Sequence, residues 1–155
     1  MRQRELMSGS WRTHIVVLAV LGGIAAGTVA FTFAYGHGAS YMTNDPEACA
    51  NCHIMKEQYG AWLQGSHRSV ATCNECHTPK PLIGKYVTKV KNGFWHSFAF
   101  TTGQFVEPIR IKDSNRAVTD TRCRECHSPV VDALAAGGPE PMSCVRCHAD
   151  VGHSS

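Results

Sequence analysis

The sequence of 155 residues lacks several patterns that are typical of common protein classes. It has no convincing alternation of apolar and polar residues that would indicate a β-strand, no low-complexity tract, and no linker that would separate two folded domains. The net charge is only +3 and is spread thinly along the chain, so nucleic-acid binding has no support. These absences leave one small, mainly α-helical domain with much irregular structure, and one extra segment at most.

The extra segment is the apolar stretch at residues 15–34, which contains no charged residue. A helix of this length rises about 30 Å, the thickness of a bilayer's hydrocarbon core. Three arginines and only one acid precede it, so the positive-inside rule puts the N-terminus in the cytoplasm. A cleaved signal peptide is the alternative, but the apolar region is long for one and AYGHGAS offers no good A-x-A site. We expect a cytoplasmic N-terminus at 1–14, an anchor helix at 15–35 and a domain at 36–155 facing the periplasm or cell exterior, all in the inner (cytoplasmic) membrane.

Three stretches after the anchor have helical patterns. Asn44, Asp45 and Pro46 mark a break and a helix start. Residues 54–64 predict a helix ended by Gly65, because their apolar residues fall on one helical face. His67 lies at the end of that helix.

A longer helix is predicted from Pro81, in its first turn, to about Ala99. On it the polar residues recur at spacings of four, three and four and form one polar stripe: Lys85, Lys89, Asn92 and His96. Residues 100–120 show no strong period and are predicted to be a loop. PVVDALAAGG, residues 129–138, predicts a short helix ended by Gly137 and Gly138.

All eight cysteines fall in CxxC pairs, and a histidine follows every pair, in CANCH, CNECH, CRECH and CVRCH. CxxCH is the attachment signature of c-type haem, in which two thiols form thioethers and the histidine can ligate the iron. Tetrathiolate zinc is the alternative, but zinc does not require these histidines, and their chance occurrence is on the order of one in 100,000. We therefore predict four covalent haems c, attached at Cys49, Cys52, Cys73, Cys76, Cys123, Cys126, Cys144 and Cys147.

Four haems on about 115 residues outside the membrane must lie close enough for electron tunnelling. They would also supply much of the core that so short a chain lacks. The fold expected is therefore one transmembrane helix and a compact multihaem cytochrome c domain.

Four six-coordinate irons need eight axial ligands, and the motif histidines His53, His77, His127 and His148 supply half. Of the other histidines, His14 lies at the cytoplasmic end of the anchor and cannot reach, and His37 follows the span directly and is expected to be solvated. His67 and His153 are the best distal candidates. Met55, two residues after His53, is either core filling or a thioether ligand. The count remains short, so at least one iron is open or is completed by a partner protein.

The anchor, the four motifs with the first extended to CANCHIM, the GSH before the second motif and KYVTKVKNGFWHSFAFTTG after it resemble the NapC/NirT-type membrane quinol dehydrogenases. The resemblance extends from the anchor to His153. It is most specific at CxxCHxM, and it is strongest to the small subunits of cytochrome c nitrite reductases.

The resemblance implies that the first haem faces the membrane, accepts electrons from menaquinol, and is ligated by Met55 and not by His53. It makes His67 and His153 distal ligands. It also implies a hetero-oligomer with a catalytic pentahaem subunit, a lysine of which ligates one haem, expected to be that of His127.

For the quinol site, the resemblance matches Lys89 to the family's lysine but puts His96 where the family has an acid. Lys89 and His96 lie on one helical face. His96 then either caps the open side of the first haem or accepts a proton from quinol, a role that suits its near-neutral pKa.

The expected function is therefore a membrane-anchored menaquinol dehydrogenase that passes electrons to a periplasmic, ammonia-forming nitrite reductase. An alternative recipient is a nitrate, trimethylamine oxide or other terminal reductase. A second alternative is a passive electron carrier and docking anchor that does not react with quinol. Nitrite reduction by this chain itself is disfavoured, because the sequence has no CxxCK motif of the kind that marks the catalytic haem of the large subunit.

Overall fold

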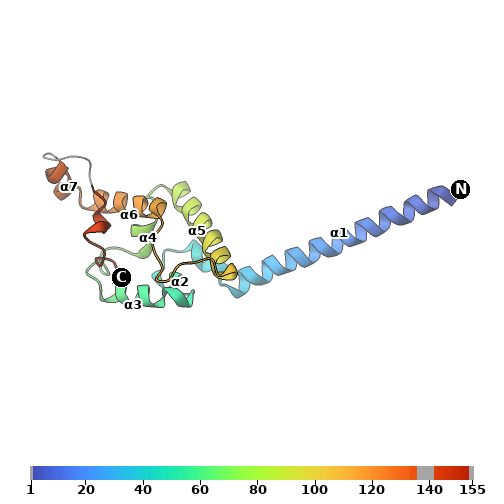
Figure 1. Ribbon diagram of the computed structural model, residues 1–155, viewed down its shortest axis with the longest axis horizontal. Coiled ribbons are helices and arrows are strands. Elements are labelled where there is room, and N and C mark those ends of the chain that lie inside the picture. Colours follow the sequence, from blue (N-terminus) through green and yellow to red (C-terminus); the bar gives the residue numbers. More distant parts are fainter. Residues whose placement is uncertain (1, 136–141, 154–155) are drawn as a thin grey trace. The chain divides into compact units, whose positions relative to one another are not determined.

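The computed structural model describes residues 2–135 and 142–153, which form helices, turns and irregular segments without a β-strand (Figure 1). The described chain divides into two units, residues 1–39 and residues 40–155. The predicted fold class, mainly α with one apolar N-terminal helix, is confirmed.

The first unit is dominated by helix α1 (Arg2–Tyr35). Its segment Ser10–Tyr35 has a mean hydropathy of 2.3 and none of it is buried, so by length and composition it is able to cross a membrane. The helix begins well before residue 15, so the arginine-containing stretch ahead of the apolar run continues the same helix. A short 3₁₀ helix, η1 (Gly38–Met42), follows.

The second unit begins with three short helical elements. Helix α2 (Pro46–Cys49) starts where the sequence predicted, with the Asp45 carboxylate accepting a hydrogen bond of 2.9 Å from the backbone N–H of Glu47. A 3₁₀ turn, η2 (His53–Met55), leads into α3 (Lys56–Gln64), and Gly65 follows the last residue as predicted. His67 therefore lies in the turn beyond α3.

Helices α4 (Cys73–His77) and α5 (Leu82–Thr102) come next. A capping box starts α4, because the Glu75 carboxylate accepts a hydrogen bond of 2.5 Å from the backbone N–H of Thr72. Pro81 caps α5 from outside and does not occupy its first turn. The helix ends at Gly103, whose φ of 70° is the left-handed conformation that glycine adopts without strain.

The loop predicted for residues 100–120 is wrong at both ends. Helix α5 continues to Thr102, and α6 (Asp113–Cys126) begins after ten further residues, so only the stretch between them is irregular. Helix α6 was missed because it is mostly polar and has no apolar period. The predicted short helix appears as α7 (Ser128–Ala135), while Gly137 and Gly138 lie outside the described residues. The last element is the 3₁₀ helix η3 (Cys144–Arg146).

The described polypeptide has almost no apolar core of its own. Ala48 is its one buried hydrophobic residue, and the other buried residues are Thr78, Thr119 and Arg122. No large side chain in residues 10–134 and 142–153 is fully buried. A folded unit of this size needs another source of buried apolar contact, which a covalently attached macrocycle provides.

Candidate haem-binding site

Each CxxCH motif lies on a helical turn. The first bridges α2 and η2, the second forms α4, the third ends α6 and the fourth forms η3. None of the eight cysteines is in a disulfide, and the second cysteine of three motifs is exposed: Cys52, Cys126 and Cys147. In the described residues no three His, Cys, Asp or Glu side chains gather as they would around a metal ion. Each motif thus presents two free thiols and a histidine on one helical turn.

The motifs are neighbours in chain order. Helix α2 contacts α4, and interaction with the Cys73 thiol lowers the pKa of Cys49 to about 7, so the first motif adjoins the second. Helix α4 packs against α6, which puts the third motif beside the second, and burial and the nearby Cys126 raise the pKa of Cys76. Helix α6 also packs against η3, which puts the third motif beside the fourth, and burial and the nearby Cys144 raise the pKa of Cys123. The four attachment points form one continuous series.

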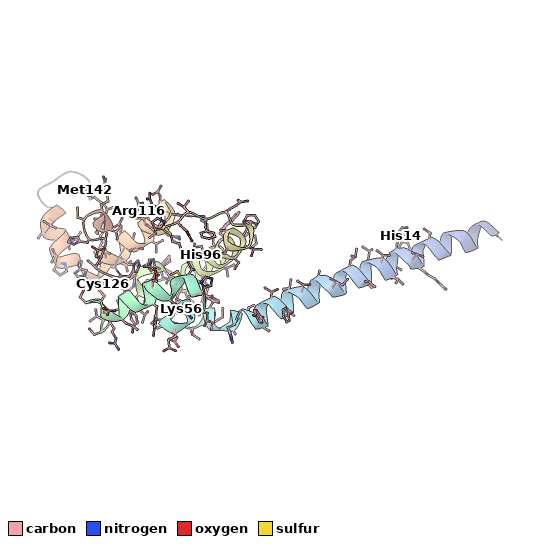
Figure 2. The ribbon with its side chains drawn as sticks, turned by 60° about the horizontal axis from the view of Figure 1, so that its bottom comes forward. His14, Lys56, His96, Arg116, Cys126 and Met142 are labelled. Atoms are coloured by element: carbon pink, nitrogen blue, oxygen red, sulfur yellow. The ribbon has the colours of Figure 1, made fainter. Side chains whose placement is uncertain are left out.

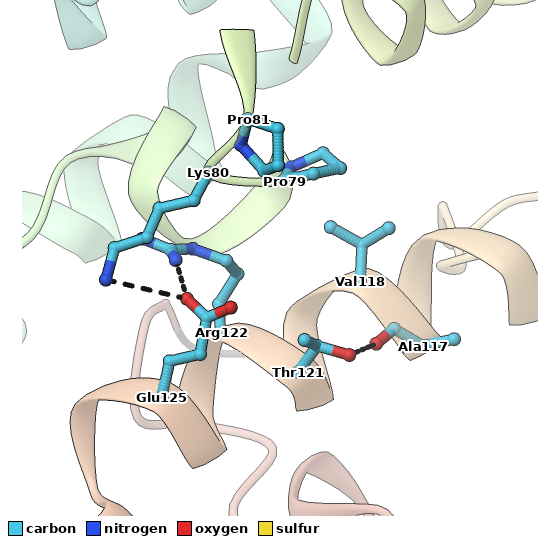
Figure 3. A pocket seen from close by; sticks show the side chains of 8 residues that line it. All are labelled: Pro79, Lys80, Pro81, Ala117, Val118, Thr121, Arg122 and Glu125. Atoms are coloured by element: carbon cyan, nitrogen blue, oxygen red, sulfur yellow. Dashed lines mark hydrogen bonds and ion pairs between the residues drawn. The ribbon is translucent and has the colours of Figure 1, made fainter. Parts of the chain in front are cut away.

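Arg122 connects the second and third motifs. Its side chain is 8% exposed, its Nε donates a hydrogen bond of 2.7 Å to the backbone carbonyl of Glu75, and its guanidinium pairs with Glu125. Lys80 lies 3.9 Å from the same carboxylate. Figure 3 shows this group beside a cavity of about 320 Å³ between Pro79–Pro81 and α6. Helix α4 therefore packs against α6 through a buried arginine.

Asp120, two residues before Arg122 on α6, holds the fourth motif. Its Oδ1 accepts hydrogen bonds from the backbone N–H groups of Cys144, at 2.8 Å, and Val145, at 3.4 Å. Arg124 donates to the carbonyl of Met142 at 3.0 Å. Helix α6 thus carries one motif and fixes the motifs on either side of it.

The histidines form two pairs. The rings of His77 and His153 stack with centroids 6.2 Å apart, and those of His67 and His127 lie edge to face at 6.1 Å. An iron flanked by two imidazoles, with metal–nitrogen bonds of about 2 Å, holds the ring centroids about 6 Å apart. Both pairs therefore have the separation that two axial ligands of one haem require.

Further contacts orient the candidate distal histidines. Nδ1 of His67 lies 3.2 Å from the backbone carbonyl of Val151 and the same distance from Oγ of Ser66. A hydrogen bond from Nδ1 to a carbonyl leaves Nε2 as the lone-pair donor, the arrangement that metal-bound histidines favour. Nδ1 of His153 is buried and has no hydrogen-bond partner within the described part of the chain.

At the first motif the two candidate ligands differ in exposure. His53 is exposed, whereas Met55 is half-buried at the end of η2. Tyr41 adjoins the same motif, because its hydroxyl lies 3.3 Å from Sγ of Cys52. A thioether, from Met55, and a phenol, from Tyr41, thus lie close to this motif.

Lys89 of α5 reaches the same region. Its Nζ donates hydrogen bonds to the carbonyls of Tyr41, at 2.8 Å, and Thr43, at 2.6 Å. Burial and the nearby charge of Lys85 lower the pKa of Lys89. An ammonium group has three donors, so one N–H of Lys89 is available to another acceptor beside the first motif.

His96 lies on α5 two turns beyond Lys89, about 10 Å along the helix axis (Figure 2). It is exposed, and partial desolvation together with the positive charge of Lys112 lowers its pKa. At neutral pH its ring is therefore an uncharged base. The structure brings Lys89 to the first motif, while His96 lies farther along the same face.

Sequence reasoning missed Arg122, Asp120 and Tyr41. The sequence did contain a signal for the start of α4, because Thr72 and Glu75 match the capping-box pattern. That pattern does not identify Arg122, Asp120 or Tyr41. The partners of Arg122 and Asp120 lie 47 and 24 residues away, beyond any local pattern.

Comparison with known proteins matches residues 10–155 to the NapC/NirT cytochrome c family, N-terminal region. The chain is 32% identical over 146 residues, 86% of its length and 82% of the relative's, to the cytochrome c-type protein NrfH of Wolinella succinogenes. It is 27% identical over 154 residues, 99% of its length and 91% of the relative's, to the cytochrome c nitrite reductase subunit NrfH of Nitratidesulfovibrio vulgaris.

Among solved structures, the chain is similar to one from the cytochrome c nitrite reductase NrfHA complex bound to the HQNO inhibitor. The TM-score is 0.59 and the identity 28%, and the match covers 88% of each chain. The similarity therefore includes both the apolar N-terminal helix and the motif-bearing unit. With its single-pass anchor and CxxCH motifs for haem c, this chain belongs to the NapC/NirT cytochrome c family.

Proposed function

We propose that this chain is the membrane-anchored menaquinol dehydrogenase of a cytochrome c nitrite reductase complex and delivers electrons to the catalytic subunit. The observation that carries the proposal is the contact of Lys89 with the carbonyls of Tyr41 and Thr43, beside Cys52 of the first motif. It puts a donor suited to a quinol oxygen next to the haem motif that follows the anchor most closely. One relative is a cytochrome c nitrite reductase subunit and the similar solved structure comes from a cytochrome c nitrite reductase complex, which supports the same function.

The orientation follows from the chain's own charge and chemistry. Arg2, Arg4 and Arg12 precede the apolar run, so the N-terminus is cytoplasmic and residues 36–155 face the periplasm. The span thus lies in the cytoplasmic membrane, where menaquinol is dissolved.

Four CxxCH motifs hold four haems c, which supply one-electron carriers between quinol and the reductase. The ring separations support His77 with His153 and His67 with His127 as the two bis-histidine ligand sets. The near absence of a buried apolar core also supports the attachment of four haems, because the macrocycles fill the space that the side chains leave.

Met55, rather than His53, is the proposed ligand of the first haem. Met55 is half-buried, whereas His53 is exposed. A thioether ligand raises a haem's reduction potential relative to two imidazoles, which favours electron uptake from quinol.

His148 is the candidate for the haem that the partner subunit completes. In the described residues its ring has no histidine opposite it, whereas His127 already has His67 at 6.1 Å. This pairing disfavours the earlier expectation that the partner's lysine ligates the haem of His127. A lysine from the catalytic subunit on the haem of His148 places the exit at the last motif.

At the entry site, Lys89 donates its remaining N–H to one quinol oxygen and orients the ring. Quinol oxidation releases two electrons and two protons, and the uncharged ring of His96 accepts a proton, with ligation of the first haem as the alternative role. Spectroscopy can distinguish the two roles of His96, because ligation affects the spin state of the first haem, whereas proton transfer does not.

The test uses the complex purified with its catalytic subunit. A menaquinol analogue should reduce the haems, and HQNO should block that reduction. The variant Lys89→Met should slow this reduction about tenfold yet keep four haems per chain by pyridine haemochrome and full reduction by dithionite. Reduction by quinol at the native rate in Lys89→Met would contradict the role of Lys89 at the quinol site. No reduction of the native complex without another dehydrogenase would favour a passive electron carrier. Recovery of a different reductase with the native chain would change the recipient.

A further inference from the structure

Helix α5 turns its apolar side away from the unit that contains it. The exposed residues include Ile83, 81% exposed, and Val90, 70% exposed, and they continue along the helix: Leu82, Val87, Phe94, Trp95 and Phe98. Tyr86 and Lys91 complete an open apolar hollow with a volume of about 580 Å³ near the start of the helix. We refer to these residues as the α5 apolar face.

The polar stripe attaches α5 to the rest of the unit. Lys85 donates to Asn44, Tyr86 Oη donates to the carbonyl of Met42 at 3.3 Å, and Lys89 binds two neighbouring carbonyls. Farther along, Asn92 accepts a hydrogen bond of 3.3 Å from Asn115. A helix in water is expected to have the opposite orientation, with its apolar stripe against the protein.

The chain segment that holds α5 is tethered to the membrane anchor. Tyr41 comes six residues after Tyr35, the last residue of α1. Six residues span at most about 20 Å when fully extended. This bound depends on chain length alone, and it keeps the first turns of α5 near the membrane surface.

The composition of α5 suits the boundary between headgroups and acyl chains. Tyr86 and Trp95 are aromatic residues with polar tips, which concentrate at that depth, and Lys91 lies at the edge of the apolar side. Amphipathic helices with this arrangement lie in the plane of the interface.

We propose that the α5 apolar face inserts into the outer leaflet of the bilayer that α1 spans, as a second, in-plane membrane contact. The inference goes beyond quinol oxidation, because it requires only the anchor, the tether and the exposed face. If the proposed function also holds, insertion of the α5 apolar face would give a quinol dissolved in the bilayer a direct path to Lys89. Lys89 lies on the polar stripe of the same helix, opposite the apolar face.

Photocrosslinking of the full complex in its native membrane tests the proposal. A photoreactive benzoylphenylalanine replaces Ile83 or Val90, with Ile24 in the anchor as the positive control and exposed Val130 on α7 as the negative control. Adducts are identified by mass spectrometry, and haem content confirms that each variant has matured.

We expect lipid adducts at Ile83 and Val90 with yields near that of Ile24, and none at Val130. Adducts to the catalytic subunit or to a second copy of this chain would overturn the proposal, as would the absence of lipid adducts at both positions while Ile24 forms them. Crosslinking does not depend on quinol turnover. The outcome is therefore independent of whether the quinol function itself holds.

Discussion

Helices α5 and α6 of the haem-binding unit differ in what they turn toward the protein. Helix α5 is amphipathic and obeys the helical period, yet its apolar face is exposed and its polar stripe makes the internal contacts. Helix α6 is mostly polar, yet two of its residues, Thr119 and Arg122, are buried and it packs against both α4 and η3.

The difference shows that hydrophobic patterning does not identify the interior of a multihaem unit. When macrocycles supply the apolar core, the polypeptide's internal contacts are largely hydrogen bonds that hold attachment motifs at fixed spacings. Apolar side chains are then available for other surroundings. Each of the following substitutions tests the role of a residue of α5 or of α6.

The largest effect is expected from Arg122→Ala. The substitution leaves the Glu75 carbonyl and the Glu125 carboxylate without their buried partner and should lower the free energy of unfolding by about 2 kcal/mol. Chemical denaturation followed by Soret absorbance measures it. Arg116→Ala is the matched control, since Arg116 forms an i,i+3 pair with the exposed Asp113 on the same helix, and it should change stability by less than about 0.5 kcal/mol. Equal losses in the two variants would contradict a special role for Arg122.

On α5, Lys89→Met should lower the rate of quinol oxidation about tenfold, because one charge-assisted hydrogen bond to the substrate is lost. Stopped-flow reduction of the haems by a menaquinol analogue measures the rate. Lys91→Met is the control, because Lys91 lies on the exposed edge of the helix and should leave the rate in detergent unchanged. A similar loss in both variants would point to general electrostatics rather than to a quinol site.

A smaller effect is expected from Asp120→Ala, which removes the acceptor for the N–H groups of Cys144 and Val145. Loss of a helix cap of this kind costs about 1 kcal/mol. Asp132→Ala is the control, because it also removes an aspartate, here from the next helix along the chain, α7. The change should appear in denaturation and, in milder conditions, as faster proteolysis after the third motif. Unchanged stability would mean that the fourth motif is held without Asp120.

The smallest effect concerns the pH profile of quinol oxidation. A base must be uncharged to accept a proton, so the rate should rise with pH through the pKa of His96. Lys112 disfavours the protonated ring and lowers that pKa. Lys112→Ala therefore raises it and should shift the acid limb toward higher pH by a few tenths of a unit. If His96 instead ligates the first haem, the limb should stay in place and His96→Ala should change that haem's spin state.

Much of the local structure was predictable from residues. Asp45 with Pro46 correctly predicted the start of α2, the apolar period correctly predicted α3 and most of α5, and four CxxCH motifs predicted haem attachment. The start of α6 was not predictable in this way, because its helix carries no apolar face and its stability comes from contacts with α4 and η3. The direction of α5 was also hidden, since periodicity identifies an apolar face but not what lies against it.

The sequence by itself determined the chemistry: an apolar run long enough for a membrane, cysteine and histidine spacings that haem attachment requires, and a lysine and histidine on one helical face. Only the tertiary structure decided which histidines face each other, that Lys89 adjoins the first motif, and that Arg122 and Asp120 fix the spacing of the other three. The physical reason is range. Motif chemistry and helical period act over a few neighbouring residues, whereas ring pairs and buried hydrogen bonds join residues as far apart as His77 and His153.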